Sequence, residues 1–127
     1  MRASHIIRAF VLTAFAALFT GCVSYNYNLA VKNVGTSEVW CSLVASSRGM
    51  AHEPGRLVPG AAATIAGPFR VPYRDHWTVS WKTASGAEVT RDLDLTQEIP
   101  APFEGRVVFT IDDSQSLGYF TEPFQGR

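Results

Sequence analysis

Clustered basic residues are missing from this sequence of 127 residues. Its 11 lysines and arginines balance 11 aspartates and glutamates, and no two basic residues stand side by side. Binding of nucleic acid requires a concentration of Lys and Arg that neutralises phosphate groups, so we expect no nucleic-acid partner. The scattered charges also leave no basic cluster that could hold anionic lipid at a membrane surface.

Cysteine is scarce, and the signatures of common catalytic and metal sites are missing. Cys22 and Cys41 are the two cysteines. A zinc site uses three or four ligands, often in H-E-x-x-H or paired C-x-x-C motifs, and neither pattern occurs. No serine stands in a G-x-S-x-G motif, and neither cysteine has the local signature of a nucleophile. We therefore predict that the protein is not an enzyme and uses no metal and no cofactor.

A few polar residues keep an alternative open. His52 and His76 could meet in space, with Glu53 and Asp75 beside them, and such a cluster would indicate a small periplasmic hydrolase or a metal-dependent enzyme. Asp112-Asp113-Ser114 offers too few oxygen ligands for a calcium loop, so we predict a turn capped by Asp side chains there.

Long apolar runs are also missing. The longest run, Ala9–Phe19, would extend roughly 16 Å as a helix, which is too short for a hydrocarbon core of about 30 Å. It follows a short segment that holds Arg2 and Arg8, and this order is typical of a signal peptide. We predict that residues 1–21 are this leader and that residues 22–127 form a single domain.

The leader ends in Leu18-Phe19-Thr20-Gly21-Cys22, which resembles the lipobox of bacterial lipoproteins. Thr20, Gly21 and Cys22 match the small residues and the modified cysteine of that motif, while Phe19 replaces the usual Leu. The resemblance implies cleavage between Gly21 and Cys22, a diacylglyceryl group on the Cys22 thiol, and a fatty acid on the new amino terminus. Two or more acyl chains anchor a protein stably to a bilayer.

Ordinary signal-peptide cleavage is the alternative to a lipobox. Ala14-Phe15-Ala16 is similar to an A-x-A site, but cleavage there would leave an apolar segment of about five residues, shorter than the usual seven to fifteen. With lipid on Cys22, the domain is expected to face the periplasm from a cell membrane or outer membrane. Val23 stands where some lipoproteins have the aspartate that retains them in the inner membrane, which favours the outer membrane. The chain from Cys22 to Tyr25 reaches at most about 10 Å, so the domain should lie against the membrane.

Apolar and polar residues alternate with a period of two along most of the mature chain, and no segment has a helical period. Turn residues such as Ser85-Gly86 separate the alternating segments. The predicted fold class is all-β: a small antiparallel β-sandwich, immunoglobulin-like or related. Strands are expected at Tyr25–Lys32, Glu38–Ala45, Trp77–Lys82, Glu88–Leu95 and Arg106–Asp112, with a weak strand at Leu117–Thr121 and a short strand or one helical turn at Ala61–Ala66.

The alternation also assigns side chains to faces. Cys41 is predicted to be a buried apolar residue, and Asp92 and Asp94 are predicted on the solvent side of their strand. Arg91 interrupts an apolar face, and we expect its stem to pack while its charged head reaches water or an aspartate. Five aromatic residues could form a binding surface, but most of them are expected in the core: Tyr25, Tyr27, Trp40, Trp77 and Trp81.

Three further segments are similar to a group of small bacterial lipoproteins. They are Leu57–Gly60, Trp77–Lys82 with its glycine turn, and Phe103–Asp112, and the likeness covers roughly residues 29–113. These positions are mostly structural, so the resemblance implies no particular chemistry.

The longest irregular stretch is Ser46–Gly60, where glycine and proline predict a surface loop. It holds Arg48, Met50, His52 and Arg56, a mixture suited to contact with a partner and of little use to a core. The competing interpretation is a tolerant loop without a role. The predicted function is that of a membrane-anchored, non-catalytic binding module of the cell envelope, whose partners are membrane lipid through Cys22 and another envelope protein.

Overall fold

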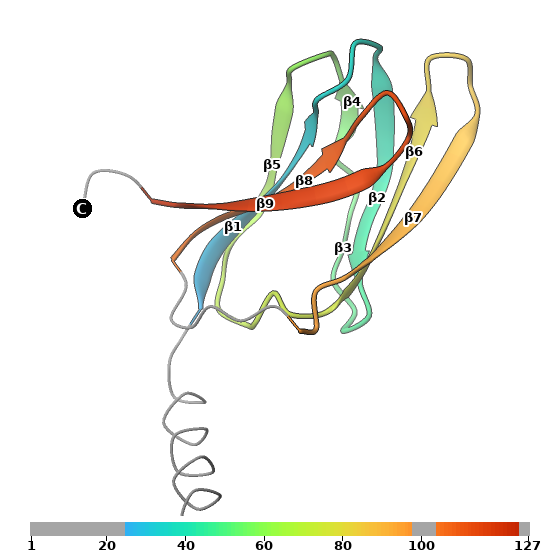
Figure 1. Ribbon diagram of the computed structural model, residues 1–127. Helices are drawn as coiled ribbons and strands as arrows, with labels where there is room; N and C mark the ends of the chain where they lie inside the picture. Colours follow the sequence, from blue (N-terminus) through green and yellow to red (C-terminus); the bar gives the residue numbers. More distant parts are fainter. Residues whose placement is uncertain (1–24, 98–103, 125–127) are drawn as a thin grey trace, which may run out of the picture.

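Two β-sheets packed face to face form the whole of the described structure, a computed structural model that covers residues 25–97 and 104–124 (Figure 1). These residues contain no helix, and the predicted all-β sandwich is confirmed. The strands are β1 (Asn26–Asn33), β2 (Val39–Ser46), β3 (Ala51–His52), β4 (Gly55–Leu57), β5 (Ala62–Phe69), β6 (His76–Thr83), β7 (Glu88–Asp94), β8 (Glu104–Ile111) and β9 (Leu117–Pro123).

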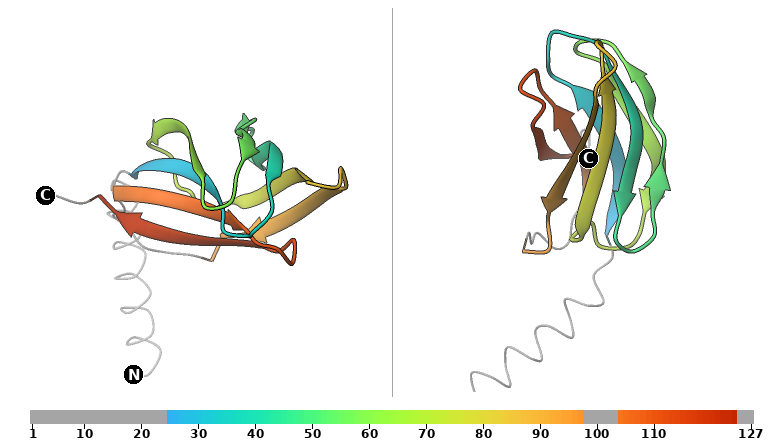
Figure 2. Two further views of the ribbon diagram at one scale, coloured as in Figure 1. Left: turned by 90° about the horizontal axis from the view of Figure 1, so that it is seen from above. Right: turned by 90° about the vertical axis from the view of Figure 1, so that its right-hand side faces the viewer.

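The first sheet has the order β5-β1-β8-β9, and the second has the order β3-β2-β6-β7 with β4 also paired to β2. Figure 2 shows the two layers from above and from the side. Neighbouring strands are antiparallel except β1 and β8, which run parallel. In the constant-type immunoglobulin order the first two strands are neighbours in one sheet, whereas β1 and β2 lie in different sheets here. The strand order of this sandwich therefore differs from the constant-type immunoglobulin order.

The core lies between the sheets and follows the predicted alternation. Tyr25, just before β1, and the side chains at positions 27, 29 and 31 of β1 are buried in the core cluster, as expected from the period of two. Trp77 of β6 meets Phe109 of β8 across the two layers, with ring centroids 5.1 Å apart. The indole N–H of Trp77 donates to the carbonyl oxygen of Tyr73 at 3.0 Å, so its one polar atom is satisfied in the core.

Cys41 is a buried free cysteine, as the sequence predicted. Burial raises the pKa of its thiol to about 11, and the thiol lies 3.8 Å from the carbonyl oxygen of Leu43, to which it donates a weak hydrogen bond. The thiol is therefore protonated at neutral pH and acts as a small apolar side chain.

Strand β2 differs from its predicted pattern. Its pairing with β6 shifts register between Cys41 and Leu43. A bulge of this kind adds one residue to the strand and reverses the faces that follow it. Val44 is therefore fully buried, while Leu43, which a strict period of two would place with Cys41 on the inner face, lies opposite Ser80 and is only half-buried.

The prediction of one irregular loop at Ser46–Gly60 is wrong. The segment contains β3 and β4, and both pair with β2. Leu57 of β4 is buried in the core cluster, and Met50 packs against that cluster. The helical-turn alternative at Ala61–Ala66 is also wrong, because these residues belong to the eight-residue strand β5 and to the turn before it.

Candidate functional site

The largest exposed apolar side chain in the described residues is Trp40, on the outer face of the second sheet. Its neighbours in β2, Val39 and Cys41, point into the core, so the period of two turns Trp40 outward. The side chain is 54% exposed. The prediction that most of the five aromatic residues lie in the core is confirmed, and Trp40 is the one of the five that lies outside it.

Cationic residues flank Trp40 on both sides. Arg56 of β4 and Lys82 of β6 are its direct cross-strand neighbours. Arg56 donates from Nε and Nη2 to Glu38 at 2.7 and 3.1 Å, and this carboxylate raises the pKa of Arg56. Lys82 lies 3.8 Å from Glu88. We call Trp40, Arg56 and Lys82 the Trp40 surface.

Along β6 and β7, the outer face of the second sheet is polar. Thr78 donates to the Asp92 carboxylate at 2.8 Å. Ser80 and Thr90 share a hydroxyl–hydroxyl hydrogen bond of 2.9 Å. Asp92 and Asp94 are exposed there, as predicted for the solvent side of β7. Trp40 is thus a large aromatic group at one end of a hydrophilic sheet face.

The four residues predicted as a contact loop do not form one surface. Arg48 lies in the turn that follows β2, whereas Arg56 pairs near the start of β2, at the other end of that strand. His52 is half-buried, with its ring centroid 5.9 Å from that of Phe69, and Met50 packs on the core. Of the four, only Arg56 belongs to the Trp40 surface.

The cluster of histidines and carboxylates that would favour an enzyme is not found in the described part of the chain. His52 packs in β3, while His76 begins β6 opposite Asp94 of β7. No group of three or more His, Cys, Asp or Glu side chains within residues 25–97 and 104–124 is placed to hold a metal ion. The turn predicted at Asp112 is confirmed: its Oδ1 accepts hydrogen bonds from the backbone N–H groups of Ser114 and Ser116, both at 3.0 Å.

Asp75 is a buried carboxylate with a structural role. Burial alone would raise its pKa, but hydrogen bonds from the Ser47 hydroxyl, the His76 backbone N–H, Ser46 and the Arg48 backbone N–H outweigh it and hold the pKa below the ordinary value. The guanidinium of Arg48 lies 3.9 Å away. These contacts fasten the turn after β2 to the residue that precedes β6.

Replacing Asp75 by asparagine is expected to destabilise the domain at pH 7 by about 2 kcal/mol, since buried acceptor sites for charged hydrogen bonds are lost. The Asp75 carboxyl has a lower pKa in the folded protein than in the unfolded chain, where the pKa is near 3.9. It therefore stabilises the fold fully at pH values above that of the unfolded chain, and this stabilisation is lost as the pH falls through the pKa of the folded protein. Thermal melts at pH 7 and pH 3 should therefore show a difference between wild type and Asp75→Asn that shrinks in acid. An equal difference at both pH values would contradict this role.

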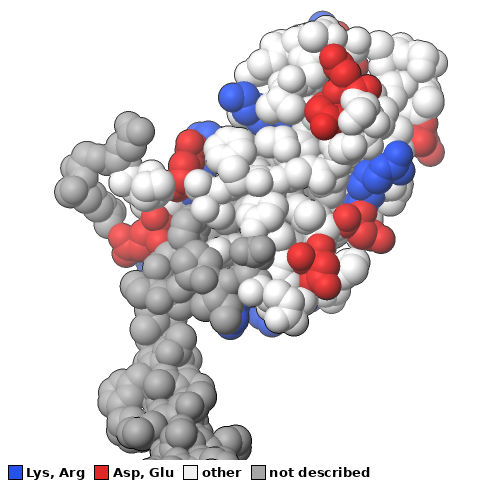
Figure 3. All heavy atoms as spheres, viewed as in Figure 1, with Lys and Arg blue, Asp and Glu red and all other residues white. Residues whose placement is uncertain are grey.

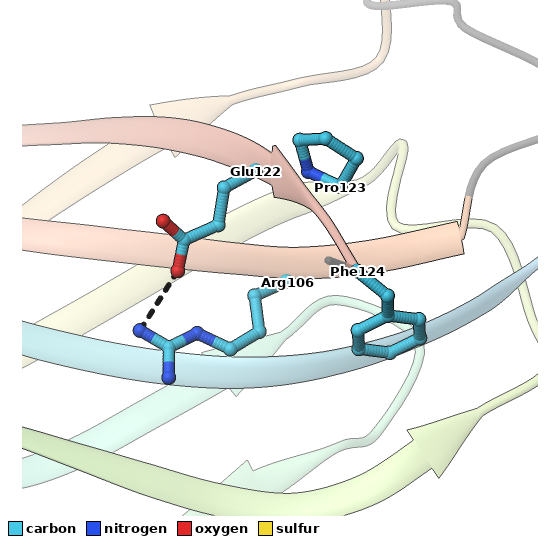
Figure 4. Close-up of a pocket in the computed structure, with 4 residues that line it drawn as sticks. All are labelled: Arg106, Glu122, Pro123 and Phe124. Carbon is cyan, nitrogen blue, oxygen red and sulfur yellow. Dashed lines mark ion pairs between the residues drawn. The ribbon is translucent and has the colours of Figure 1, made fainter. Parts of the chain in front are cut away.

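Two shallow hollows are present among the described residues. One of about 310 Å³ is lined by Arg106, Glu122, Pro123 and Phe124. Figure 4 shows Arg106 and Glu122 pointing toward each other, and their Nη2–Oε1 distance is 2.9 Å. Because this pair largely neutralises its own charge, the hollow is poorly suited to binding an ion. The other, of about 250 Å³, lies between the β3–β4 segment and β5 and includes His52.

Comparison of the chain with protein-family models, curated proteins and solved structures finds no match. No helix in the described ranges is long and apolar enough to cross a bilayer. The leader, Gly21 and Cys22 lie outside the described residues.

Proposed function

We propose that the protein is a bacterial lipoprotein anchored through Cys22, and that its β-sandwich is a non-catalytic module that binds another envelope protein. The leader and the motif Thr20-Gly21-Cys22 support the anchor. The first described residue, Tyr25, is three residues beyond the anchor, which keeps Tyr25 within about 10 Å of Cys22. Val23 favours the outer membrane, with the domain on the periplasmic side.

The exposure of Trp40 is the observation that carries the binding role. Burial of an aromatic side chain is strongly favourable in free energy, yet Trp40 is left more than half exposed. Trp and Arg dominate the energetically important positions of protein interfaces, and Arg56 stands directly beside Trp40. A protein partner with an apolar recess and a carboxylate would match both.

The position of the Trp40 surface also suits a partner in the periplasm. β1 begins at the anchored end and runs away from it, and β2 starts at the far end after one turn (Figure 1). Trp40 is the second residue of β2. The surface therefore lies at the end of the sandwich that faces away from the membrane in the anchored protein.

Site-specific photocrosslinking in cells tests this proposal. With photoreactive p-benzoylphenylalanine in place of Trp40, the full chain is expected to form one discrete adduct with an envelope protein, because the probe occupies the centre of the contact. The same probe at Thr90, exposed on the same sheet face, is the matched control. Arg56→Ser should weaken the adduct without unfolding the domain, since an exposed ion pair contributes little to stability. Absence of an adduct at position 40, or identical adducts at positions 40 and 90, would contradict the proposal.

A further inference from the structure

The edges of the two sheets differ in how they are protected. An edge strand presents unpaired backbone N–H and C=O groups, and proteins normally block such edges with charge, proline, short strands or a covering segment. The strand orders place β5 and β9 at the edges of the first sheet, and β7 and the short strands β3 and β4 at the edges of the second.

Three of these edges carry recognisable protection. β7 contains four charged residues in seven: Glu88, Arg91, Asp92 and Asp94. β3 and β4 have only two and three residues, and Glu53-Pro54 separates them. That separating segment also lies against β5, because Glu53 and Pro54 line one hollow together with Ala63 and Ile65.

β9 has none of these devices over most of its length. Its first five residues, Leu117–Thr121, include no charge and no proline. Their register with β8 is continuous, without a bulge, and no strand among the described residues pairs with the other side of β9. In Figure 3, uncharged atoms cover the middle of this edge, and charged groups gather toward its ends.

A row of apolar side chains on the outer face of the first sheet ends at this edge. Ala30 of β1 is opposite Val108 of β8, which is opposite Phe120 of β9. Ala30 and Val108 are fully buried although they lie outside the core cluster, whereas Phe120 is 38% exposed. A further strand beside β9 would cover the exposed side of Phe120 and continue the row.

We infer that this edge binds a second copy of the chain, with β9 pairing antiparallel to its counterpart about a two-fold axis at Phe120. Such a contact uses the same patch on both copies. In this register Phe120 meets Phe120, an aromatic cross-strand pair of the stabilising kind. Glu122 falls opposite Gly118, so no like charges face each other, and Arg106 already holds the Glu122 carboxylate within its own sheet. The two first sheets thereby become one continuous sheet.

The test is the mass of the full chain purified from membranes in mild detergent, by light scattering corrected for bound detergent. The wild type is expected at twice the monomer mass. Phe120→Lys should halve that mass, because it places two lysines opposite each other across the axis. Thr90→Lys on the charged edge of β7 is the matched control and should remain dimeric, and a melt of each variant shows whether it is folded. A monomeric wild type, or a dimer that survives Phe120→Lys, would overturn the inference.

A cysteine at the axis identifies the occupant of the edge. Phe120→Cys should give a disulfide-linked pair of this chain on mild oxidation of membranes, since facing Cβ atoms are about 4.5–5.5 Å apart. The unsubstituted chain, whose Cys41 is buried, is the control. Crosslinking of the Phe120→Cys variant to a different envelope protein instead would show that another extended segment occupies the edge and would refute the second copy. Neither readout depends on the Trp40 surface, so the two proposals fail separately.

Discussion

Replacing Cys22 by alanine is expected to remove all fatty-acid labelling of the protein and to release it from the anchored membrane fraction. The thiol at this position is the attachment point of the diacylglyceryl group in the proposed lipobox, and alanine has no atom that could carry it. Growth with an alkyne-tagged fatty acid, followed by membrane fractionation, measures both effects.

Cys41→Ala is the matched control for this experiment. The Cys41 thiol is buried between the sheets, and burial raises its pKa to about 11, so it is neither accessible nor reactive. The control should be labelled like the wild type. If Cys22→Ala kept its label, the acyl chains would be attached elsewhere and the lipobox hypothesis would be wrong.

The second large effect is expected from Gly105→Ala, near the start of β8. A Cβ atom at this position would overlap the backbone carbonyl oxygen of Glu122 and lie 2.9 Å from the Cα atom of Pro123. Backbone atoms cannot rotate away, so β9 must shift and lose part of its pairing. Steric overpacking of this kind lowers the free energy of unfolding by about 3 kcal/mol. For a domain of this size, such a loss lowers the thermal midpoint by more than about 10 °C.

Gly118→Ala provides the comparison within the same strand pair. Its added Cβ would meet only the Thr110 hydroxyl, at 2.9 Å, and that side chain can change rotamer. The midpoint of this variant should stay within a few degrees of the wild type. Equal losses in the two glycine variants would mean that β8 and β9 approach each other less closely at Gly105 than these distances require.

Local alternation was sufficient to predict five long strands: β1, β2, β6, β7 and β8. In β1 and β6, the inward residues from Tyr27 to Val31 and from Trp77 to Trp81 are apolar and most outward residues are polar, so the period of two is visible in sequence. The turn between β6 and β7 was predictable for a related reason: Gly86 has φ of 89°, a conformation that glycine adopts without strain.

Features that depend on distant partners could not be predicted in this way. β3 and β4 are too short to show a period, and they exist because β2 pairs with both. The bulge in β2 lies two residues after Trp40. Both faces of this segment are fairly apolar, so the sequence shows no change from apolar to polar residues at the bulge. Arg91 is exposed, as expected for a head that reaches water, but the contact of its Nε with the carbonyl oxygen of Gln115, at 3.1 Å, depends on the distant turn before β9.

At position 40, the type of residue favours the core, whereas the position in the strand favours the surface. Trp40 alternates with Val39 and Cys41, and this pattern alone placed it outward. Its hydrophobicity favoured a core position, and the glycine and proline residues of segment 46–60 predicted the contact surface there instead. Arg56 was correctly selected as a surface residue, but its neighbour Trp40 became visible only through the pairing of β4 with β2.

The intact mass of the protein purified from membranes tests the proposed anchoring most directly. We predict a chain that begins at Cys22 and carries a diacylglyceryl group and one amide-linked fatty acid, with Cys41 as a free thiol. A chain without lipid that begins at another residue, or one in which Cys22 is joined to Cys41 by a disulfide, would contradict the account.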